Sequence, residues 1–177
     1  MIERVLREVA TRPANNGVRI VGVDGFGGAG KSTFARALAT AADAPLVHVD
    51  DFLSWHDLTG WWPRFEAEVL APLLAGRDAT YRVRDWDADE FGDALNGTKT
   101  TPAAPLVVVE GLTCTRRGSP VTYAVWVEAP YDVCLARGIE RDGESHRDLW
   151  LMTLREQAEF FAADGTRERA DLVVVTA

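Results

Sequence analysis

The sequence predicts an α/β protein in which helices cover both faces of a parallel sheet. Three observations lead to this prediction. Short runs of β-branched residues alternate along the chain with segments of helical periodicity. These runs are continuously apolar, which is typical of strands buried on both faces, and the first of them leads into a glycine-rich turn. The length of 177 residues fits a single domain, 1–177.

The first part of the chain supplies two predicted helices and two predicted strands. Residues 2–11 have an amphipathic pattern, which predicts a helix. The β-branched run 18–24 ends at the glycine-rich turn and is expected to be a buried strand. Apolar residues then recur at helical spacing over 31–42, and 46–49 is a short apolar run that ends at two aspartates. We therefore expect the order helix, strand, helix, strand.

The second part of the chain continues this alternation after an irregular region, 52–104. Within that region apolar residues at a spacing of four predict a helix over 62–74. Pro130 fits the first turn of a helix that extends to about residue 141, because proline is favoured at that position. Ser145 is a candidate cap for a last helix. The remaining strands are predicted at 106–109, 123–127 and 172–175.

Composition argues against several classes of function. The net charge is −8, so a broad basic surface for nucleic acid is not expected. No apolar run approaches the roughly 20 residues of a membrane span, and the charged N-terminal segment is unlike a signal peptide. Cys114 and Cys134 form neither a disulfide framework nor a metal-type pair. We expect a cytoplasmic protein with reduced thiols and no nucleic-acid or membrane partner.

The glycine-rich turn matches the phosphate-binding pattern G-x-x-x-x-G-K-[ST] between Gly25 and Ser32. Glycines let backbone N–H groups converge on phosphate oxygens, and the following helix adds the positive end of its dipole. Lys31 can reach the β- and γ-phosphates, and the Ser32 hydroxyl can bind Mg²⁺. The chain has 17 arginines but only two lysines, so a lysine at this position is informative. Nucleotide contacts are expected from Gly25, Gly27, Gly28, Ala29, Gly30, Lys31, Ser32 and Thr33.

Two other interpretations of the turn are open. The same residues satisfy G-x-G-x-x-G, and Asp50 lies where a dinucleotide-binding protein would hold a ribose. A dinucleotide site has no use for Lys31 and Ser32 at the helix start, however. The turn could also carry no ligand. A strand before it and a helix after it favour the phosphate-binding interpretation.

Two carboxylates end predicted strands: Asp50 follows 46–49 and Glu110 follows 106–109. Ligands of parallel α/β sheets bind at the carboxyl ends of strands, so both are expected near the γ-phosphate. One carboxylate there can accept the proton of an attacking hydroxyl, and the other can hold Mg²⁺ through water. Ser32, Asp50 and Glu110 are therefore the candidate metal residues. The alternative for each carboxylate is a helix cap or a solvated loop.

Two arginines stand four apart on one predicted helix. Arg137 and Arg141 precede Asp142 and a glycine, and the segment 137–148 has the form of a lid. Arginines over a transferring phosphoryl group stabilise the negative charge spread over its oxygens, so Arg137, Arg141 and Lys31 are candidate catalytic residues. The alternative is a solvated helix in which Glu140 and Asp142 pair with these arginines.

The irregular region 52–104 is the candidate acceptor-binding region. Four of the six tryptophans lie between residues 52 and 91, which suggests a pocket with apolar walls and a few polar anchors. An aspartate could hold substrate hydroxyls and an aromatic ring could stack on a substrate ring. The competing interpretation is that these rings bind no ligand and are either buried in the core or exposed on the surface. The candidate substrate-binding residues are Asp51, Tyr81, Asp85 and Trp86.

These motifs together resemble the uridine kinase-like branch of the P-loop kinases. The similar segments follow the family's order over nearly the whole chain: 23–32, 49–52, 69–73, 109–111, Arg137 with 141–143, and 170–173. The resemblance implies a three-layer fold with a five-stranded parallel sheet and ATP-dependent phosphorylation of a small-molecule hydroxyl. It implies Asp50 as the base, Ser32 with Glu110 around Mg²⁺, and Arg137 and Arg141 in a closing lid.

We therefore expect a kinase that uses ATP and Mg²⁺ and acts as a monomer or homodimer. A nucleoside is the first-choice acceptor and another hydroxylated metabolite the second, because 81–87 departs from the Tyr-Asp-Phe/His-x-x-Pro pattern of the family. A nucleotide-dependent switch that hydrolyses ATP slowly is an alternative from another class. The tryptophan-rich region favours the kinase, because a switch needs partner-facing loops instead of a cavity.

Overall fold

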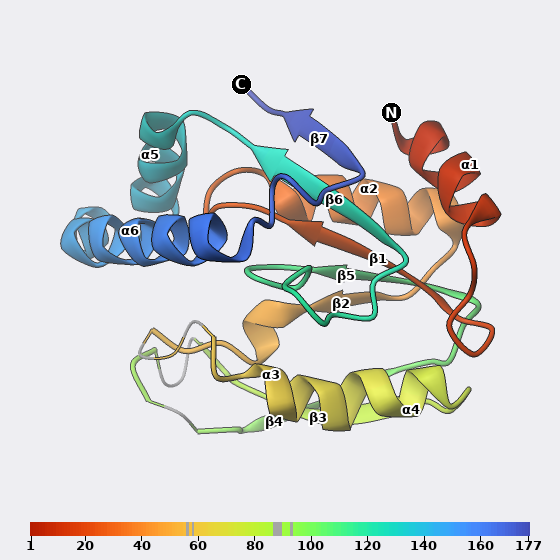
Figure 1. Ribbon diagram of the computed structural model, residues 1–177. Helices are drawn as coiled ribbons and strands as arrows, with labels where there is room; N and C mark the ends of the chain where they lie inside the picture. Colours follow the sequence, from red (N-terminus) through yellow and green to blue (C-terminus); the bar gives the residue numbers. More distant parts are fainter. Residues whose placement is uncertain (56, 58, 87–89, 93) are drawn as a thin grey trace.

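A five-stranded parallel sheet forms the middle layer of the molecule (Figure 1). The computed structural model describes residues 1–55, 57, 59–86, 90–92 and 94–177. The strand order is β2-β5-β1-β6-β7, and every neighbouring pair is parallel. The strands are β1 (Arg19–Asp24), β2 (Leu46–His48), β5 (Leu106–Glu110), β6 (Tyr123–Glu128) and β7 (Leu172–Val175). The prediction of a five-stranded parallel sheet is confirmed.

Helices lie on both sides of this sheet, as predicted (Figure 1). Pro130 caps the helix that it was expected to open. Ser145 does not cap the last helix: it lies inside a short 3-10 turn, and the cap position is His146. The helical segments are α1 (Ile2–Thr11), α2 (Lys31–Ala42), η1 (Val49–Asp51), α3 (Trp62–Phe65), η2 (Glu66–Leu70), α4 (Ala71–Leu74), α5 (Tyr131–Asp142), η3 (Glu144–His146) and α6 (Arg147–Asp164).

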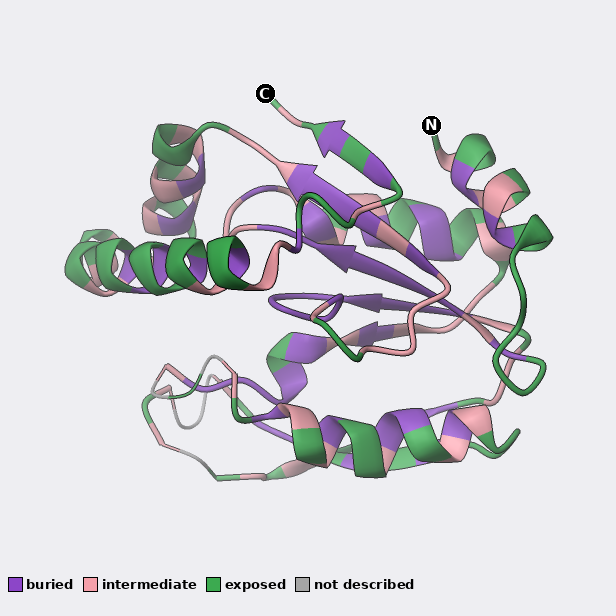
Figure 2. Ribbon diagram, in the orientation of Figure 1, coloured by how far each residue is buried: buried purple, intermediate pink, exposed green. Residues whose placement is uncertain are grey.

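Two hydrophobic cores lie on the two faces of the sheet. Adjacent strand residues point to opposite faces, so Ile20 of β1 packs in one core and Val21 in the other. Helices α1 and α2 cover the face of Val21, and the continuous helical segment 62–74 covers the face of Ile20. Figure 2 shows the central strands buried almost throughout. Burial on both faces explains why these strands are continuously apolar in the sequence.

A two-stranded antiparallel hairpin, absent from the predicted elements, lies in the acceptor region. It consists of β3 (Ala79–Val83) and β4 (Gly97–Thr101). Strand β3 alternates buried and exposed residues, and its buried side chains pack into the core beneath the helical segment 62–74. Strand β4 consists of glycine, threonines and a lysine, so it carries no hydrophobic pattern. Of the helices in the described ranges, none has the length and apolar character that a membrane crossing requires.

The sheet brings the carboxyl ends of three strands together. In the strand register, Glu110 at the end of β5 stands between Val23 of β1 on one side and His48 of β2 on the other. The glycine-rich turn leaves β1 at this edge, and η1 leaves β2 beside it. The residues predicted to act on phosphate therefore converge where parallel α/β sheets bind their ligands.

Candidate active site

The glycine-rich turn forms a loop between β1 and α2, and its glycines are required by geometry. Gly25, Gly28 and Gly30 have φ values of +141°, +76° and +95°, which side chains rarely adopt. A Cβ atom at Gly25 would lie 2.0 Å from the carbonyl oxygen of Val127. The loop therefore approaches the backbone of β6 more closely than any other residue type would permit.

Lys31 and Ser32 begin the helix that follows the loop. Lys31 is buried, and its ammonium group donates a hydrogen bond to the carbonyl oxygen of Phe26 at 2.8 Å. This contact folds the lysine back over the loop, so that its charge faces the space in which phosphates would lie. Loop N–H groups, a lysine and a helix N-terminus are together an anion-binding arrangement.

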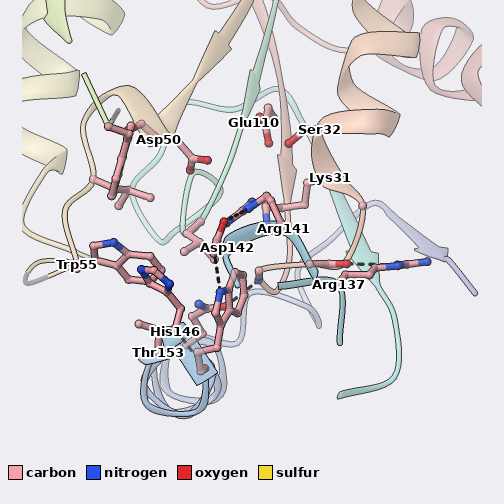
Figure 3. A pocket seen from close by; sticks show the side chains of 18 of the residues that line it. Lys31, Ser32, Asp50, Trp55, Glu110, Arg137, Arg141, Asp142, His146 and Thr153 are labelled. Carbon is pink, nitrogen blue, oxygen red and sulfur yellow. Dashed lines mark hydrogen bonds and ion pairs between the residues drawn. The ribbon is translucent and has the colours of Figure 1, made fainter. Parts of the chain in front are cut away.

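A cleft of about 830 Å³ lies over the loop and the strand ends. Figure 3 shows the side chains that surround it. The sequence-predicted residues that line the cleft are Gly27, Gly28, Gly30, Lys31, Ser32, Thr33, Asp50, Trp86, Glu110, Arg137 and Arg141. Gly25, Ala29, Asp51, Tyr81 and Asp85 are not among its lining residues. The phosphate-binding and carboxylate predictions thus converge on one cavity, whereas the acceptor predictions do so only for Trp86.

Glu110 is buried at the end of β5 and is held from two sides. Its Oε1 lies 2.5 Å from Nδ1 of His48, a residue that the sequence analysis did not select. Burial alone would raise the pKa of Glu110, but the hydrogen bond from His48, the charge of Lys31 and a hydrogen bond from Ser32 lower it below its ordinary value. Glu110 is therefore held as a carboxylate facing Ser32 (Figure 3).

Asp50 lies in η1, one residue after the predicted strand, and faces the cleft. Asp50 as a whole residue is exposed to solvent, although the cleft surrounds its carboxylate. Desolvation by the surrounding cleft and the charge of Glu110 raise the pKa of Asp50 above its ordinary value, while Lys31 and Arg141 oppose that rise. The Trp86 indole donates a hydrogen bond to the backbone oxygen of Asp50 at 3.1 Å. Trp86 therefore fixes the segment that carries the candidate base, besides lining the cleft.

The other strand-end aspartate predicted from the sequence, Asp51, points elsewhere. Its two carboxylate oxygens lie 2.6 and 2.9 Å from the ammonium group of Lys99 on β4. The ion pair joins η1 to the hairpin, outside the cleft lining. Tyr81 of β3 is also part of the scaffold: it is 3% exposed and stacks on Phe52. Asp85 is exposed and likewise stands outside the lining.

Asp24, the residue before the glycine-rich turn, is fully buried and structural. Its carboxylate accepts hydrogen bonds from the backbone N–H groups of Gly25, Thr113 and Thr115, and from the hydroxyl of Thr115. Burial raises the pKa of Asp24, and these hydrogen bonds oppose the rise. The carboxylate ties the start of the phosphate loop to the turn after β5.

The two arginines of the lid-like segment have different surroundings. Nη1 of Arg137 donates to the carbonyl oxygen of Gly28 at 3.2 Å and to the hydroxyl of Thr176 at 3.3 Å. Its guanidinium points away from Asp50 in Figure 3. Arg141 is oriented toward the cleft and makes two hydrogen bonds to Asp142. Arg137 therefore holds the phosphate loop, and Arg141 is the arginine whose charge acts on Asp50.

Aromatic side chains form one wall of the cleft, which we call the aromatic wall and which reaches the phosphate loop at Gly27 through Trp150: Trp55, Trp86, His146 and Trp150. The Trp55 ring stands edge-on to those of Trp86 and Trp150, at centroid distances of 6.1 and 6.4 Å. His146 stacks on Trp55 and lies 2.6 Å from Oε1 of Glu90. The acceptor region and the lid-like segment therefore meet at this wall. His146 and Trp150 gave no functional motif, because their placement depends on how α5 and α6 pack. Asp142 stood in the segment 141–143 and pairs with Arg141, as the alternative interpretation of that helix expected.

Comparisons with known proteins find likeness in structure alone. No model of a protein family and no curated protein sequence matches the chain. A possible uridine kinase from Bacillus stearothermophilus has a TM-score of 0.66 and 16% identity, over 98% of this chain and 96% of that one. A candidate fructose transport system kinase from Silicibacter sp. TM1040 has a TM-score of 0.65 and 22% identity, over 97% and 96%. A sugar kinase from Janibacter sp. HTCC2649 has a TM-score of 0.50 and 19% identity, over 90% and 84%.

Proposed function

We propose, from the premise that this chain has the fold of the uridine kinase-like P-loop kinases, that it is an ATP- and Mg²⁺-dependent kinase of a small hydroxylated molecule. The observation that carries the proposal is the convergence of Lys31, Ser32, Asp50 and Glu110 on one cleft beside the phosphate loop. Two solved structures with this fold are named as a possible uridine kinase and a candidate fructose transport system kinase. Both names denote kinases, which transfer a phosphoryl group.

Asp50 is the base of the proposed reaction. The oxygen of the acceptor hydroxyl forms a bond to the γ-phosphorus of ATP, and the bond from that phosphorus to the β-bridging oxygen breaks to release ADP. The hydroxyl proton goes to the Asp50 carboxylate. Desolvation in the cleft raises the pKa of Asp50, which makes its carboxylate a stronger proton acceptor than an ordinary aspartate.

Lys31, Arg141 and the loop N–H groups stabilise the charge of the transferring phosphoryl group. Lys31 is already folded over the loop by its contact with Phe26. Arg141 stands close enough to Asp50 for their charges to interact. Fixed cations around the γ-phosphate lower the barrier because they need little rearrangement as negative charge shifts. Arg137 contributes by holding the Gly28 carbonyl, which shapes the loop.

The donor set around Ser32 suits Mg²⁺. The Ser32 hydroxyl and the Glu110 carboxylate are hard oxygen ligands, which this ion prefers, and Asp50 would meet the ion through a bound water, which leaves its carboxylate able to take the hydroxyl proton. In the described part of the chain, no group of three or more histidine, cysteine, aspartate or glutamate side chains is placed to hold a metal by itself. Mg²⁺ keeps several waters and phosphate oxygens, so a sparse protein set fits it. When bound, the ion would neutralise phosphate charge.

The acceptor binds against the aromatic wall in this proposal. Trp55 and Trp86 are partly exposed and line the cleft together with Asp50. Flat indole surfaces and a few polar groups suit a nucleoside, the first-choice acceptor, and leave another hydroxylated metabolite as the second.

The test is ADP release from ATP and Mg²⁺ against a panel of nucleosides, sugars, amino alcohols and vitamin precursors. Lys31→Ala is the blank, because it removes the phosphate-binding cation. A signal that depends on one acceptor and is absent in the variant supports the kinase. Hydrolysis that no acceptor stimulates, together with a partner protein whose affinity changes with nucleotide, would favour a switch. Absence of ATP binding to the wild-type chain would contradict the assignment of the phosphate loop.

A further inference from the structure

A second cavity adjoins the cleft, and the proposed reaction makes no use of it. This side pocket has a volume of about 280 Å³ and lies between the turn after β5 and helix α6. Leu112 and Gln157 line both cavities, so the two are neighbours. A molecule bound in the cleft with one end at Asp50 could therefore extend its other end past Leu112 into the side pocket.

Thr113 is an unusual residue in the side pocket. It is 2% exposed, and within the described ranges its hydroxyl has no hydrogen-bond partner. Buried hydroxyls are nearly always satisfied, because an unmade hydrogen bond costs more than the bond itself contributes. The described residues therefore leave the donor and acceptor capacity of the Thr113 hydroxyl unused.

The backbone places Thr113 there under strain. Its φ is +62°, a conformation that β-branched residues rarely adopt. Buried Asp24 maintains the turn by accepting hydrogen bonds from the N–H groups of Thr113 and Thr115. Strained backbone conformations cluster at functional sites, which directs attention to this residue.

The lining of the side pocket indicates the chemistry of its ligand. No lysine or arginine is among its described lining residues, so the pocket does not suit a phosphate or carboxylate. Carboxylate, hydroxyl and carboxamide groups can each pair with ligand hydroxyls, and an aromatic ring can pack on the C–H face of a sugar. These groups are supplied by Asp57, Thr59, Thr113, Glu156, Gln157 and Phe160.

We infer that the side pocket binds the end of the acceptor remote from the reacting hydroxyl, and that this end is polyhydroxylated, as in a sugar or sugar alcohol. The inference rests on the proposed kinase function. Thr113 is then a specificity-determining residue: its hydroxyl pairs with a ligand hydroxyl, while the Glu156 carboxylate and the Gln157 amide N–H offer further polar partners beside it. The Gln157 side-chain carbonyl oxygen is already used, because it accepts a hydrogen bond from the Gly27 N–H at 2.8 Å. An amine-bearing remote end is the chemical alternative, because two carboxylates line the pocket.

The decisive variant is Thr113→Val, which replaces the hydroxyl by a methyl group and keeps the β-branched shape and its backbone strain. Thr113→Ser restores the hydroxyl. Thr115→Val is the matched structural control, because the Thr115 hydroxyl lies in the same turn but donates to Asp24 at 2.9 Å. We expect Thr115→Val to lower the melting temperature, and Thr113→Val to leave it unchanged or raise it, since only the first breaks an existing hydrogen bond.

Binding is measured first without ATP, by calorimetry or ligand-observed NMR. The probes are pentoses, hexoses and their alditols, with 1,5-pentanediol as the matched compound for ribitol that lacks the internal hydroxyls. We expect at least one polyol to bind the wild-type chain and to bind Thr113→Val about tenfold more weakly. Its affinity should return to the wild-type value in Thr113→Ser. A tenfold loss corresponds to one neutral hydrogen bond. The KM for ATP should be unchanged in both Thr113 variants.

The outcomes separate this inference from the kinase proposal. Polyol binding that is weakened in Thr113→Val but never leads to ADP release supports the side pocket and contradicts the kinase. A phosphorylated acceptor whose KM is the same in wild type and Thr113→Val supports the kinase and overturns the side pocket. The inference is also overturned when no polyol binds the wild-type chain, or when amines bind and polyols do not.

Discussion

The indole of Trp150 occupies the space beside Gly138 that any side chain there would need. A Cβ atom at Gly138 would lie 2.4 Å from Cδ2 and Cε2 of the indole, and one at Gly27 would lie 2.8 Å from Cζ3. The same indole donates to Asp142 at 2.9 Å and meets Trp55 edge-on. One side chain of α6 thus joins the phosphate loop, helix α5 and the aromatic wall.

Gly138→Ala should therefore destabilise the protein. Alanine inside a helix is ordinarily favourable relative to glycine by roughly 0.5–1 kcal/mol. Here the added methyl group would overpack against Trp150, and overpacking costs about 1–3 kcal/mol. We expect a lower free energy of unfolding in urea, and a double variant with Trp150→Phe to lose less than the sum of the single variants. A Gly138→Ala chain more stable than wild type would contradict this packing.

Asp142→Asn should show a pH-dependent loss of stability. Partial burial would raise the pKa of Asp142, but the hydrogen bonds and charge of Arg141 and the Trp150 N–H hold it below its ordinary value. A carboxylate with a lowered folded pKa stabilises the protein above its unfolded pKa of about 3.9, and the contribution is lost as the pH falls through the folded pKa. Melting temperatures of wild type and variant should differ at pH 7 and converge below about pH 4. If the difference in melting temperature were instead the same at every pH, Asp142 would stabilise the protein through packing and not through its charge.

Arg137→Ala should weaken ATP binding more than it slows turnover. Arg137 holds the carbonyl oxygen of Gly28 and the Thr176 hydroxyl, and its loss would free the phosphate loop to move. We expect the KM for ATP to rise about tenfold, the size of one or two hydrogen bonds. Arg141→Ala is the comparison, because Arg141 faces the reacting groups and its loss should lower kcat. Equal effects of the two variants on kcat would contradict the assignment of Arg137 to ATP binding and of Arg141 to turnover.

Lys99→Met should leave acceptor binding unchanged. Lys99 pairs with Asp51, and this pair stands outside the cleft. The substitution keeps the aliphatic stem and removes the charge, so we expect a loss of stability on the order of 1 kcal/mol, as for a partly exposed ion pair. Thermal unfolding measures the first effect, and the acceptor KM the second. A large rise in acceptor KM would place Asp51 at the substrate, as its position in the sequence suggests.

The phosphate loop and the strand-end carboxylates could be predicted because their positions follow from local rules. A glycine-rich turn that ends in lysine and serine and follows an apolar strand is specific for phosphate binding. Parallel strands bring their carboxyl ends to one edge of the sheet. His48 also stands at a strand end, so the rule that selected Asp50 and Glu110 could have included it.

The acceptor-binding part of the cleft was predicted less accurately than the phosphate loop, because its form depends on packing between distant segments. Tyr81 has the composition of a binding residue, yet β3 turns it into the core against Phe52. Strand β4 lacks any hydrophobic pattern and forms only through its pairing with β3. Trp150 reaches the cleft because Gly138 lets α5 and α6 approach each other. No spacing within either helix reveals that contact.

The most direct test of the central claim is a comparison of wild type with Asp50→Asn. The measurements are ATP affinity and the rate at which the acceptor from the panel gains a phosphoryl group, followed by mass spectrometry of the product. We predict that turnover falls by about 10² to 10⁴, the usual contribution of a general base, while the Kd for ATP changes little. Phosphorylation by Asp50→Asn at the wild-type rate would contradict the assignment of the base and of the reaction derived from it.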